Sequence, residues 1–345
     1  YMSNKPPIEV PQGAIRLNTD SQKLEFFAQD RWYEMATNTP TLNGGSRGFI
    51  LGGYPGYSDK IERFDIATAG NGVDFGDLAY ATSLKANVSD RTRLCTFGDY
   101  GSPDTTVTNS IEFITMSSDG DTVDFGDMSE GRYSAQPVNN STRGVFMGGT
   151  NVYNSVSGTI NNIEFITIQS TGNSVDFGDM TTKTSTGQGF SSPTRGVSAG
   201  GTNPGGGGRQ TLIQYITTST LGNTQDFGDL LIAAAFTCAN TASNSIRGLI
   251  TNNNTAPGTY QNTIQFVTIA TTGDVTNFGD LIRGSEWCCA MASPTRAVFH
   301  NPGGNANQEH MEYSQIMTAG NSVDFGDISQ DLSRTSAGSN GHGGL

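Results

Sequence analysis

The most regular candidates for chemistry in this sequence are six aspartates that recur at a nearly constant interval. Each stands two residues after a phenylalanine, in a Phe-Gly-Asp phrase. They are Asp77, Asp127, Asp179, Asp229, Asp280 and Asp327, and Glu34 stands at the matching place of a divergent first copy. Carboxylates can act as acids or as metal ligands. Residues at one position of stacked repeats lie one repeat apart, however, so these side chains cannot converge on one ligand. The pattern predicts a structural role.

Six arginines recur with a similar period and offer a partner for these aspartates. They are Arg47, Arg93, Arg143, Arg195, Arg247 and Arg296. A buried charge is tolerated where an opposite charge or a hydrogen-bond donor satisfies it. We therefore predict that the repeated aspartates are buried or half-buried partners of these arginines or of turn amides. Both sets would then belong to the scaffold.

Residues for catalysis are sparse. A copper site of the galactose-oxidase type needs His and Tyr ligands gathered together, and a sialidase needs an arginine cluster. The three histidines (His300, His310, His342) form no ligand-spaced pair, and the non-repeated Arg132, Arg209 and Arg283 show no evident clustering. A Ser-His-Asp arrangement is equally unsupported. We expect no enzyme activity, no metal and no cofactor.

The elements that position these residues belong to one repeated unit. The phenylalanine of the phrase falls at Phe75, Phe125, Phe177, Phe227, Phe278 and Phe325, and an alternating apolar run begins fourteen residues earlier in every copy. Self-similarity at a period of about 40–50 residues indicates a repeat architecture. Each copy offers four extended segments: a small-residue segment (A), an Arg-Gly segment (B), an "IEF" segment (C) and a Phe-Gly-Asp segment (D). Alternation with period two predicts strands, so each copy is expected to be an antiparallel four-stranded sheet.

The two ends of the chain can be read as halves of one further copy. Residues 12–35 offer segments B, C and D without A, whereas residues 333–341 offer an isolated A segment. Joining them would remove free sheet edges. The sequence thus predicts an all-β, seven-bladed β-propeller over 12–345, with 333–341 paired with 12–18. The alternative is six blades plus a small N-terminal β module. Residues 1–11 are expected to be an extended arm that attaches the propeller to its assembly.

The B–C loops are the least regular part of the repeat and the better candidates for binding. They are rich in Asn, Gly and Tyr, and loops on a rigid scaffold commonly carry recognition. An exposed ring can stack on a ligand while neighbouring amides donate hydrogen bonds, which suits a carbohydrate or protein surface. The alternative is that variable length only marks tolerance at exposed tips. The candidate ligand-binding residues are Tyr54, Tyr57, Tyr100, Tyr153, Asn154, Tyr260 and Gln261.

Charge and hydropathy exclude some classes of partner. The formal net charge is −13 over 345 residues, and binding to nucleic acid needs a basic surface that displaces counterions. The sequence also lacks a run of about 18–20 apolar residues that would span a bilayer as a helix. We expect neither nucleic-acid binding nor insertion in a membrane.

The order of segments resembles kelch repeats: an apolar run, Gly-Gly, a variable loop, an aromatic-containing strand and then a further aromatic. Phenylalanine stands where kelch blades usually carry tryptophan, which only Trp32 keeps. The longer phrase "SSPTRGV…IEFITI.STGN.VDFGDM" resembles tandem repeats of bacteriophage tail-fibre and virion-appendage proteins. The N-terminal "GAIRLNTDSQKLEFFAQDRWYEM" is similar to a short module of phage fibre proteins.

This resemblance implies a non-enzymatic structural protein of a virion, either a tail fibre or a capsid appendage. Its partners would be other virion proteins and a host-surface glycan or receptor, met through the B–C loop face, and an oligomer is compatible with such a role. Two alternatives remain open. One is a purely structural or decorating protein without a ligand, and the other is a hydrolase that acts on polysaccharide.

Overall fold

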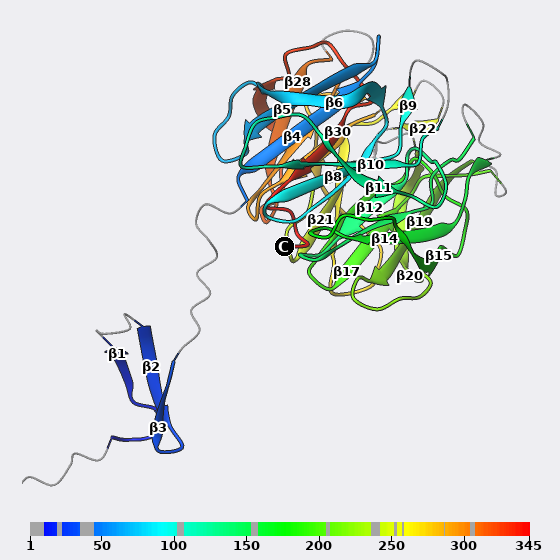
Figure 1. Ribbon diagram of the computed structural model, residues 1–345. Coiled ribbons are helices and arrows are strands. Elements are labelled where there is room, and N and C mark those ends of the chain that lie inside the picture. Colours follow the sequence, from blue (N-terminus) through cyan, green and yellow to red (C-terminus); the bar gives the residue numbers. More distant parts are fainter. Residues whose placement is uncertain are drawn as a thin grey trace, which may run out of the picture. The chain divides into compact units, whose positions relative to one another are not determined.

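The chain divides into two compact units, residues 1–44 and residues 45–345. The computed structural model describes residues 10–18, 23–34, 45–101, 107–152, 158–204, 208–235, 242–251, 254–256, 259–285, 287–303 and 308–345. All regular structure in this described part is β-strand, and the sheets are antiparallel (Figure 1). The expectation of an all-β protein is confirmed.

The first unit contains a three-stranded sheet of its own. It consists of β1 (Ile15–Asn18), β2 (Lys23–Ala28) and β3 (Arg31–Glu34), paired in that order. Aromatic rings face each other across the strands, because Phe26 pairs with Tyr33 and Phe27 with Trp32. The Arg16 guanidinium lies 4.1 Å from the centre of the Trp32 ring. These strands occupy the segments that the sequence predicts for the divergent first copy.

In the described part of the second unit there are six sheets of three to five strands and one two-stranded hairpin, and we number the six sheets along the chain by their Arg-Gly strand. Sheet 1 has β30 (Ser336–Ser339), β4 (Arg47–Gly53), β5 (Ser58–Asp65), β6 (Val73–Ser83) and β9 (Tyr100–Gly101). Sheet 2 has β7 (Ala86–Ser89), β8 (Arg93–Phe97), β10 (Ser110–Thr115) and β11 (Val123–Asp127). Sheet 3 has β12 (Gln136–Asn139), β13 (Arg143–Met147), β14 (Asn162–Thr167) and β15 (Val175–Asp179).

The remaining three sheets repeat this order. Sheet 4 has β16 (Gln188–Ser191), β17 (Arg195–Ala199), β19 (Gly208–Thr217) and β20 (Gln225–Ala234), with β18 (Thr202–Asn203) beside β19. Sheet 5 has β21 (Arg247–Thr251), β24 (Thr263–Thr268) and β25 (Thr276–Asp280), and a hairpin of β22 (Asn254–Ala256) and β23 (Thr259–Tyr260) lies between the first two in sequence. Sheet 6 has β26 (Cys289–Ala292), β27 (Arg296–His300), β28 (His310–Gln315) and β29 (Val323–Asp327).

The fixed fourteen-residue spacing follows from a shared register. In sheet 3, Ile163 pairs with Gly178, and the register shifts by a bulge between Ile163 and Glu164. All six sheets have this pairing and this bulge at the same place. A bulge adds one residue to a strand and bends it. Any change in the spacing would therefore break the pairing, which explains why the interval never varies.

The six sheets are linked into a closed cycle by one repeated main-chain hydrogen bond. A glycine in the turn between the last two strands of each sheet donates to the phenylalanine carbonyl of the preceding sheet. The donors Gly120, Gly172, Gly222, Gly273, Gly320 and Gly70 meet Phe75, Phe125, Phe177, Phe227, Phe278 and Phe325 at 2.7–2.8 Å. The last bond joins sheet 6 to sheet 1. We call this assembly the six-sheet ring.

Glycine is required where neighbouring sheets approach most closely. At Gly126, φ is +147°, and a Cβ atom would lie 2.5 Å from the carbonyl oxygen of Gly172 in the next sheet. A side chain at this position is excluded both by backbone conformation and by space. The glycine of the Phe-Gly-Asp phrase therefore allows the main chains of successive sheets to come into contact.

The predicted pairing of residues 333–341 with residues 12–18 is wrong. Strand β30 pairs with β4 instead, with Ser336 opposite Leu51 and Ser339 opposite Gly48, and Figure 1 shows the two strands adjacent. Strand β30 therefore supplies the small-residue segment of sheet 1. The six sheets and the separate N-terminal β module agree with the alternative of six repeated units plus a module, and not with seven units.

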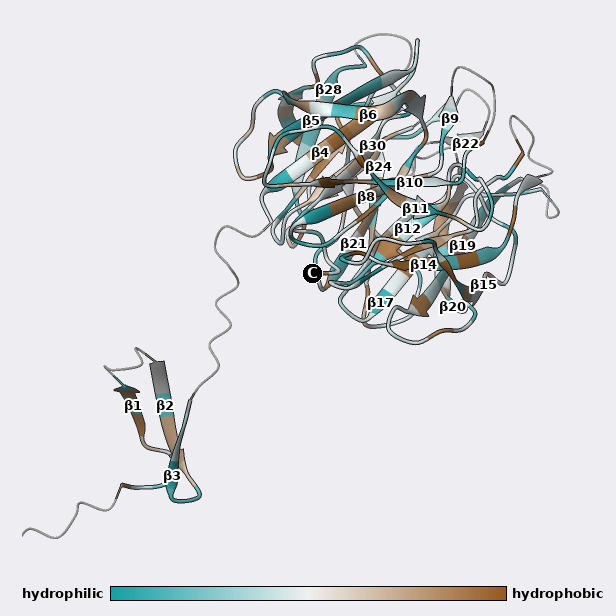
Figure 2. Ribbon diagram, viewed as in Figure 1, coloured by the Kyte–Doolittle hydropathy of each residue, from teal (hydrophilic) through white to brown (hydrophobic). Residues whose placement is uncertain are grey.

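The core lies between neighbouring sheets. One cluster joins Val88 and Phe97 of sheet 2 to Phe146 and Ile166 of sheet 3, and all four side chains are buried. Figure 2 shows apolar residues along the strands and polar residues in many of the loops. Because each sheet contributes one face to each of two interfaces, no sheet has a complete core by itself. Its stability depends on its neighbours, as in other repeat proteins.

Candidate functional site

The repeated arginines connect sheets through main-chain carbonyls. Each donates from Nη1 to a carbonyl of the next sheet, as Arg93 does to Ile168 at 3.0 Å and Arg296 does to Ile66 at 3.0 Å. The other four do the same. In sheets 2 to 6 the guanidinium also stacks on an aromatic ring of its own sheet at 4.1–4.7 Å. The arginines are scaffold residues, but the predicted aspartate partners are wrong.

The repeated aspartates contact the next sheet through their main-chain N–H and carbonyl groups. The N–H of Asp179 donates to Asn223 Oδ1 of the next sheet at 3.0 Å, and its carbonyl accepts from the Thr224 N–H. Equivalent bonds occur at the other five positions. The side chains of Asp127, Asp179 and Asp229 are exposed, and the other three are half-buried. Among the described residues, two of these side chains have a local partner: Asp77 accepts from Lys60, and Asp229 accepts from Thr211.

Replacing Asp179 with alanine is therefore expected to change stability by no more than about 0.5 kcal/mol, as for ordinary surface sites. Replacing Asn223 with alanine removes the acceptor between sheets and is expected to lower the free energy of unfolding by about 1 kcal/mol. Urea unfolding of both variants measures the difference. If Asp179→Ala lowered stability as much as Asn223→Ala, the aspartate side chain and not its main chain would carry the contact.

A second polar position, which the sequence analysis did not single out, is buried in all six sheets. It directly follows the apolar residue that starts the "IEF" run, and its members are Glu62, Glu112, Glu164, Gln214, Gln265 and Glu312. Each accepts a hydrogen bond from a main-chain N–H of the preceding sheet. A Glu or Gln fixed within an apolar run is the signal that could have revealed it. These residues join sheets and are not gathered in one site.

Two of these glutamates form an ion pair with a buried basic side chain. Glu164 lies 2.6 Å from Arg132, and Glu112 lies 3.4 Å from Lys85. Burial alone would raise the pKa of Glu112, but the Lys85 ammonium and several hydrogen bonds outweigh it and the pKa lies below its ordinary value. Burial lowers the pKa of Arg132, although Glu164 and Glu130 oppose that effect. Both pairs are enclosed between sheets, so they serve stability.

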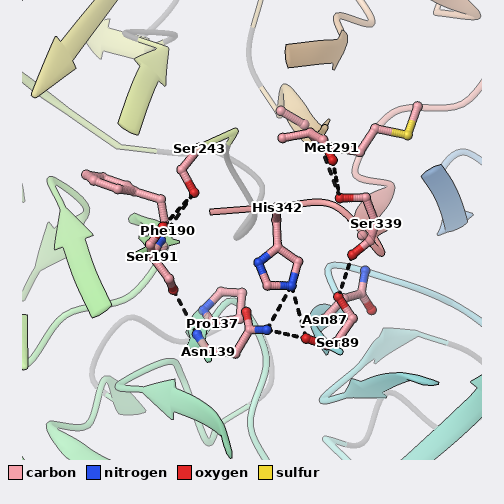
Figure 3. Close-up of a pocket in the computed structure, with 14 residues that line it drawn as sticks. Asn87, Ser89, Pro137, Asn139, Phe190, Ser191, Ser243, Met291, Ser339 and His342 are labelled. Atoms are coloured by element: carbon pink, nitrogen blue, oxygen red, sulfur yellow. Dashed lines mark hydrogen bonds between the residues drawn. The ribbon is translucent and has the colours of Figure 1, made fainter. Parts of the chain in front are cut away.

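The centre of the six-sheet ring leaves little space for a ligand. A cavity of about 30 Å³ is lined by the innermost strands, among them Asn139, Ser191 and Ser339 (Figure 3). His342 points into it, and its Nε2 lies 2.9 Å from Asn139 Nδ2 and 3.0 Å from the Ser89 carbonyl oxygen. Burial lowers the pKa of His342 to about 4. Such a volume holds about one water molecule, so this cavity has no room for a larger ligand.

The loop face carries the strongest candidate for binding, which is a run of stacked rings. The rings of Tyr54 and Tyr57 lie 5.6 Å apart, edge to face. The Arg334 guanidinium lies 4.8 Å from the centre of the Tyr54 ring and 5.1 Å from that of Trp287. Tyr54 is 39% exposed, and Tyr57, Trp287 and Arg334 are half-buried. A cation between two rings holds their orientation.

The same face bears a second aromatic pair. Tyr100 and Tyr133 lie 5.0 Å apart, and together with Trp287 they pack on one buried apolar cluster that includes Leu84 and Leu332. We call Tyr54, Tyr57, Tyr100, Tyr133, Trp287 and Arg334 the aromatic collar. Its residues come from the β4–β5 loop, from β9 and from the segments that precede β12, β26 and β30.

The segments that carry the collar share one backbone conformation. Leu84, Ser134, Thr186, Trp287 and Arg334 each stand two residues before an innermost strand, and each has φ between +54° and +65°. Three main-chain bonds join four of these residues in a row. The Leu84 N–H donates to the Arg334 carbonyl, that of Ser134 to Leu84, and that of Thr186 to Ser134. Left-handed backbone at non-glycine residues persists only where surrounding structure fixes it, and it is common at binding sites.

A groove lies beside the collar. It has a volume of about 310 Å³ and is lined by Tyr57, Lys60 and Asp331 among other residues of the β4–β5 loop, the start of β5 and the segment after β29. Ser58 and Gln330 also line it, and Ser58 Oγ donates to Gln330 Oε1 at 2.8 Å. The groove combines a ring with charged and amide groups, so it can accept both the apolar and the hydroxyl-bearing parts of a ligand.

The structure gathers part of the predicted binding set. Tyr54, Tyr57 and Tyr100 belong to the collar, whereas Tyr260 is 41% exposed on β23 and makes no ring contact with it among the described residues. Gln261 is half-buried beside it. Tyr153 and Asn154 lie outside the described residues. Sequence reasoning missed Tyr133, Trp287 and Arg334, whose shared place before an innermost strand was the available signal.

Within the described residues, no group of three or more His, Cys, Asp or Glu side chains could hold a metal ion. In the same part of the chain, no helix is long and apolar enough to cross a membrane. Comparison with known proteins adds no assignment: no protein-family model matches the chain, and no curated protein resembles it significantly.

Proposed function

We propose that residues 45–345 form a six-bladed β-propeller that binds a ligand through the aromatic collar and does not act as an enzyme. Each of the six sheets would be one blade, with its small-residue strand innermost. Support for this architecture comes from the closed cycle of Gly–Phe hydrogen bonds and from the contacts of β30 with both β7 and β26. Ring closure holds the loops of all blades on a rigid base.

The observation that carries the binding function is the stack of Tyr57, Tyr54, Arg334 and Trp287. Rings held in fixed orientation bury ligand area at a small cost in conformational entropy. Their apolar faces suit the C–H faces of sugars, and the adjacent groove supplies hydrogen-bonding groups. The proposed ligand class is therefore a glycan on a cell surface, with a protein receptor as the other candidate.

We propose that the protein is part of a phage particle, because its repeats resemble those of phage tail-fibre and appendage proteins. A virion protein that meets its host needs a rigid, ligand-binding head and a means of attachment. The separate N-terminal sheet is a candidate for the attachment, with other virion proteins as partners. Electron microscopy of particles labelled with an antibody to this chain tests that location.

A glycan array tests the binding function. The full chain is expected to bind specific surface glycans, and Tyr57→Gly and Trp287→Gly are expected to lose most of that binding. Glycine readily adopts φ above zero, so these variants remove the rings at Tyr57 (φ +48°) and Trp287 (φ +65°) without adding backbone strain. Tyr80→Ala is the matched control, because Tyr80 is 44% exposed on β6 outside the collar.

The array also separates the alternatives. Binding that survives in both collar variants would contradict the collar as the site. An absence of binding to any glycan or host surface protein would favour a purely decorating role. Incubation with host polysaccharide followed by size analysis addresses the third reading, since shortened chains would identify a hydrolase.

A further inference from the structure

One sheet departs from the repeat at a position where the others agree. Two residues after the start of the "IEF" run, five sheets carry an aromatic ring on which their repeated arginine stacks: Phe113, Phe165, Tyr215, Phe266 and Tyr313. Sheet 1 carries Arg63 there. Within the described part of the chain, its repeated arginine, Arg47, therefore stacks on no ring. In place of a stacked pair, two guanidinium groups line one hollow of about 380 Å³. We call it the sheet 1 hollow.

The two arginines are differently engaged. Arg47 keeps the bond of its counterparts and donates from Nη1 to the Met116 carbonyl. Arg63 is 38% exposed, and its Nε lies 3.5 Å from Asp119 of the next sheet. The Nε atom of Arg63 is buried and makes no hydrogen bond within the described residues. Because the side chain is partly exposed, its terminal N–H groups can donate to a ligand, and a planar fork of N–H groups matches a carboxylate.

The rest of the hollow mixes donors, an acceptor and an apolar wall. Ser46, Thr68 and Asn71 bring hydroxyl and amide groups, and Phe64 and Val73 bring apolar surface. Asp65 also lines it and uses one carboxylate oxygen to accept from the Ala67 N–H at 3.0 Å. The volume falls within the roughly 300–1,000 Å³ typical of small-molecule sites.

This combination selects among anions. Asp65 in the wall and Asp119 beside Arg63 would repel a doubly charged phosphate or sulfate. A ligand that carries one carboxylate together with hydroxyl groups fits better, because its hydroxyls can donate to Asp65 while the carboxylate meets the arginines. We propose that the sheet 1 hollow binds an acidic sugar residue, such as a uronic acid, through Arg63 and Arg47.

The proposal uses residues separate from the aromatic collar. The hollow lies beside the turn between β5 and β6, whereas the collar lies on the loops between β4 and β5 and on the segments before the innermost strands. Collar variants such as Tyr57→Gly are therefore expected to leave it intact. Failure of one proposal would not imply failure of the other.

Calorimetric titration of the full chain with a galacturonate trisaccharide tests the inference. Binding to the unchanged protein is expected, and Arg63→Phe is expected to weaken it at least tenfold, which corresponds to the loss of a charge-assisted hydrogen bond. Arg63→Phe installs the residue type of the other sheets, so its melting temperature is expected to stay the same or rise. Arg63→Gln removes the charge with less change of volume and should weaken binding similarly.

Three controls decide the outcome. Arg91→Ala removes a positive charge from the neighbouring exposed turn and should leave binding unchanged. The methyl ester of the trisaccharide, which lacks the charge, should bind at least tenfold more weakly than the acid. Equal binding of acid and ester, equal binding by Arg63→Phe, or inorganic sulfate binding as tightly as the sugar would each overturn the proposal.

Discussion

Deleting residues 333–345 is expected to abolish cooperative folding of the six-sheet ring, whereas deleting residues 1–44 is expected to leave its unfolding transition unchanged. The first deletion removes β30, the strand that pairs with β4. It also removes the link between neighbouring innermost strands, because Ser89 Oγ donates to the Ser339 carbonyl and Ser339 Oγ donates to Ala292. Sheet 1 would be left with an unpaired edge at the closure of the cycle.

The size of the effect follows from the core that β30 covers. Ala337 and Leu332 belong to one buried cluster with Ile50, Leu84 and Met291. Exposing a buried aliphatic side chain of this size loses about 1.5–3 kcal/mol, and whole domains are stable by only about 5–15 kcal/mol. Exposure of several such residues, added to the lost strand pairing, is enough to unfold the ring.

Thermal unfolding followed by circular dichroism, with size-exclusion chromatography, measures both deletions. The fragment 45–345 should melt at the temperature of the second unit in the full chain. The fragment 1–332 should show no cooperative transition and should aggregate through its open edge. If deleting 1–44 were as damaging as deleting 333–345, the N-terminal strands would complete the ring after all, and six-sheet closure would be wrong.

The repeat unit was predictable because its signals are local. The Phe-Gly-Asp phrase, the fourteen-residue interval and the Arg-Gly start all follow from strand pairing within one sheet, where neighbours in space are near neighbours in sequence. The closure of the ring could not be predicted in this way. The segment "SRTSAGSNG" contains only small and polar residues, which suit the innermost strand of any sheet. Its choice between residues 12–18 and 47–53 depends on a contact between the two ends of the chain, which no local pattern encodes.

The candidate site was predictable only in part for a related reason. Tyr54 and Tyr57 lie in one loop, so their proximity is local. Trp287 and Arg334 reach the same place from two other segments, and only the fold brings them together. The prediction for the aspartates was wrong because it assumed that a residue that recurs in a turn acts through its side chain. In this ring the main chain of each aspartate makes the contact, and the identity of the side chain is nearly irrelevant to it.

Replacing Glu164 with alanine is expected to lower the free energy of unfolding by about 3–5 kcal/mol, the range for removing one partner of a buried ion pair. Arg132 is fully buried and Glu164 is 3% exposed, with Nη2 and Oε1 2.6 Å apart. Among the described residues, Arg132 would keep hydrogen bonds to the carbonyls of Gly148 and Asn162, each at 3.3 Å, and its contact with the Phe146 ring. Glu164 also accepts from Ser129 and Ser174, whose donors would lose their acceptor.

Glutamine at the same position separates charge from hydrogen bonding. Sheets 4 and 5 already carry Gln214 and Gln265 there, so the shape and the acceptor oxygen fit. Glu164→Gln should therefore be more stable than Glu164→Ala but less stable than the unchanged protein, since Arg132 keeps its charge without a partner. Combining Glu164→Gln with Arg132→Met removes that charge and should recover part of the loss. Urea unfolding of the unchanged protein, Glu164→Gln, Arg132→Met and the combined variant forms a double-mutant cycle.

The cycle distinguishes a buried ion pair from an exposed one, because the two lose different amounts of stability when one partner is removed. A surface pair typically contributes about 0.2–1 kcal/mol, and removing either partner has a similarly small effect. A loss below about 1 kcal/mol for Glu164→Ala would mean that water reaches Arg132 between sheets 2 and 3. A large loss that Arg132→Met partly restores would instead locate the energy in the desolvated charge, and would show that this interface of the ring excludes water.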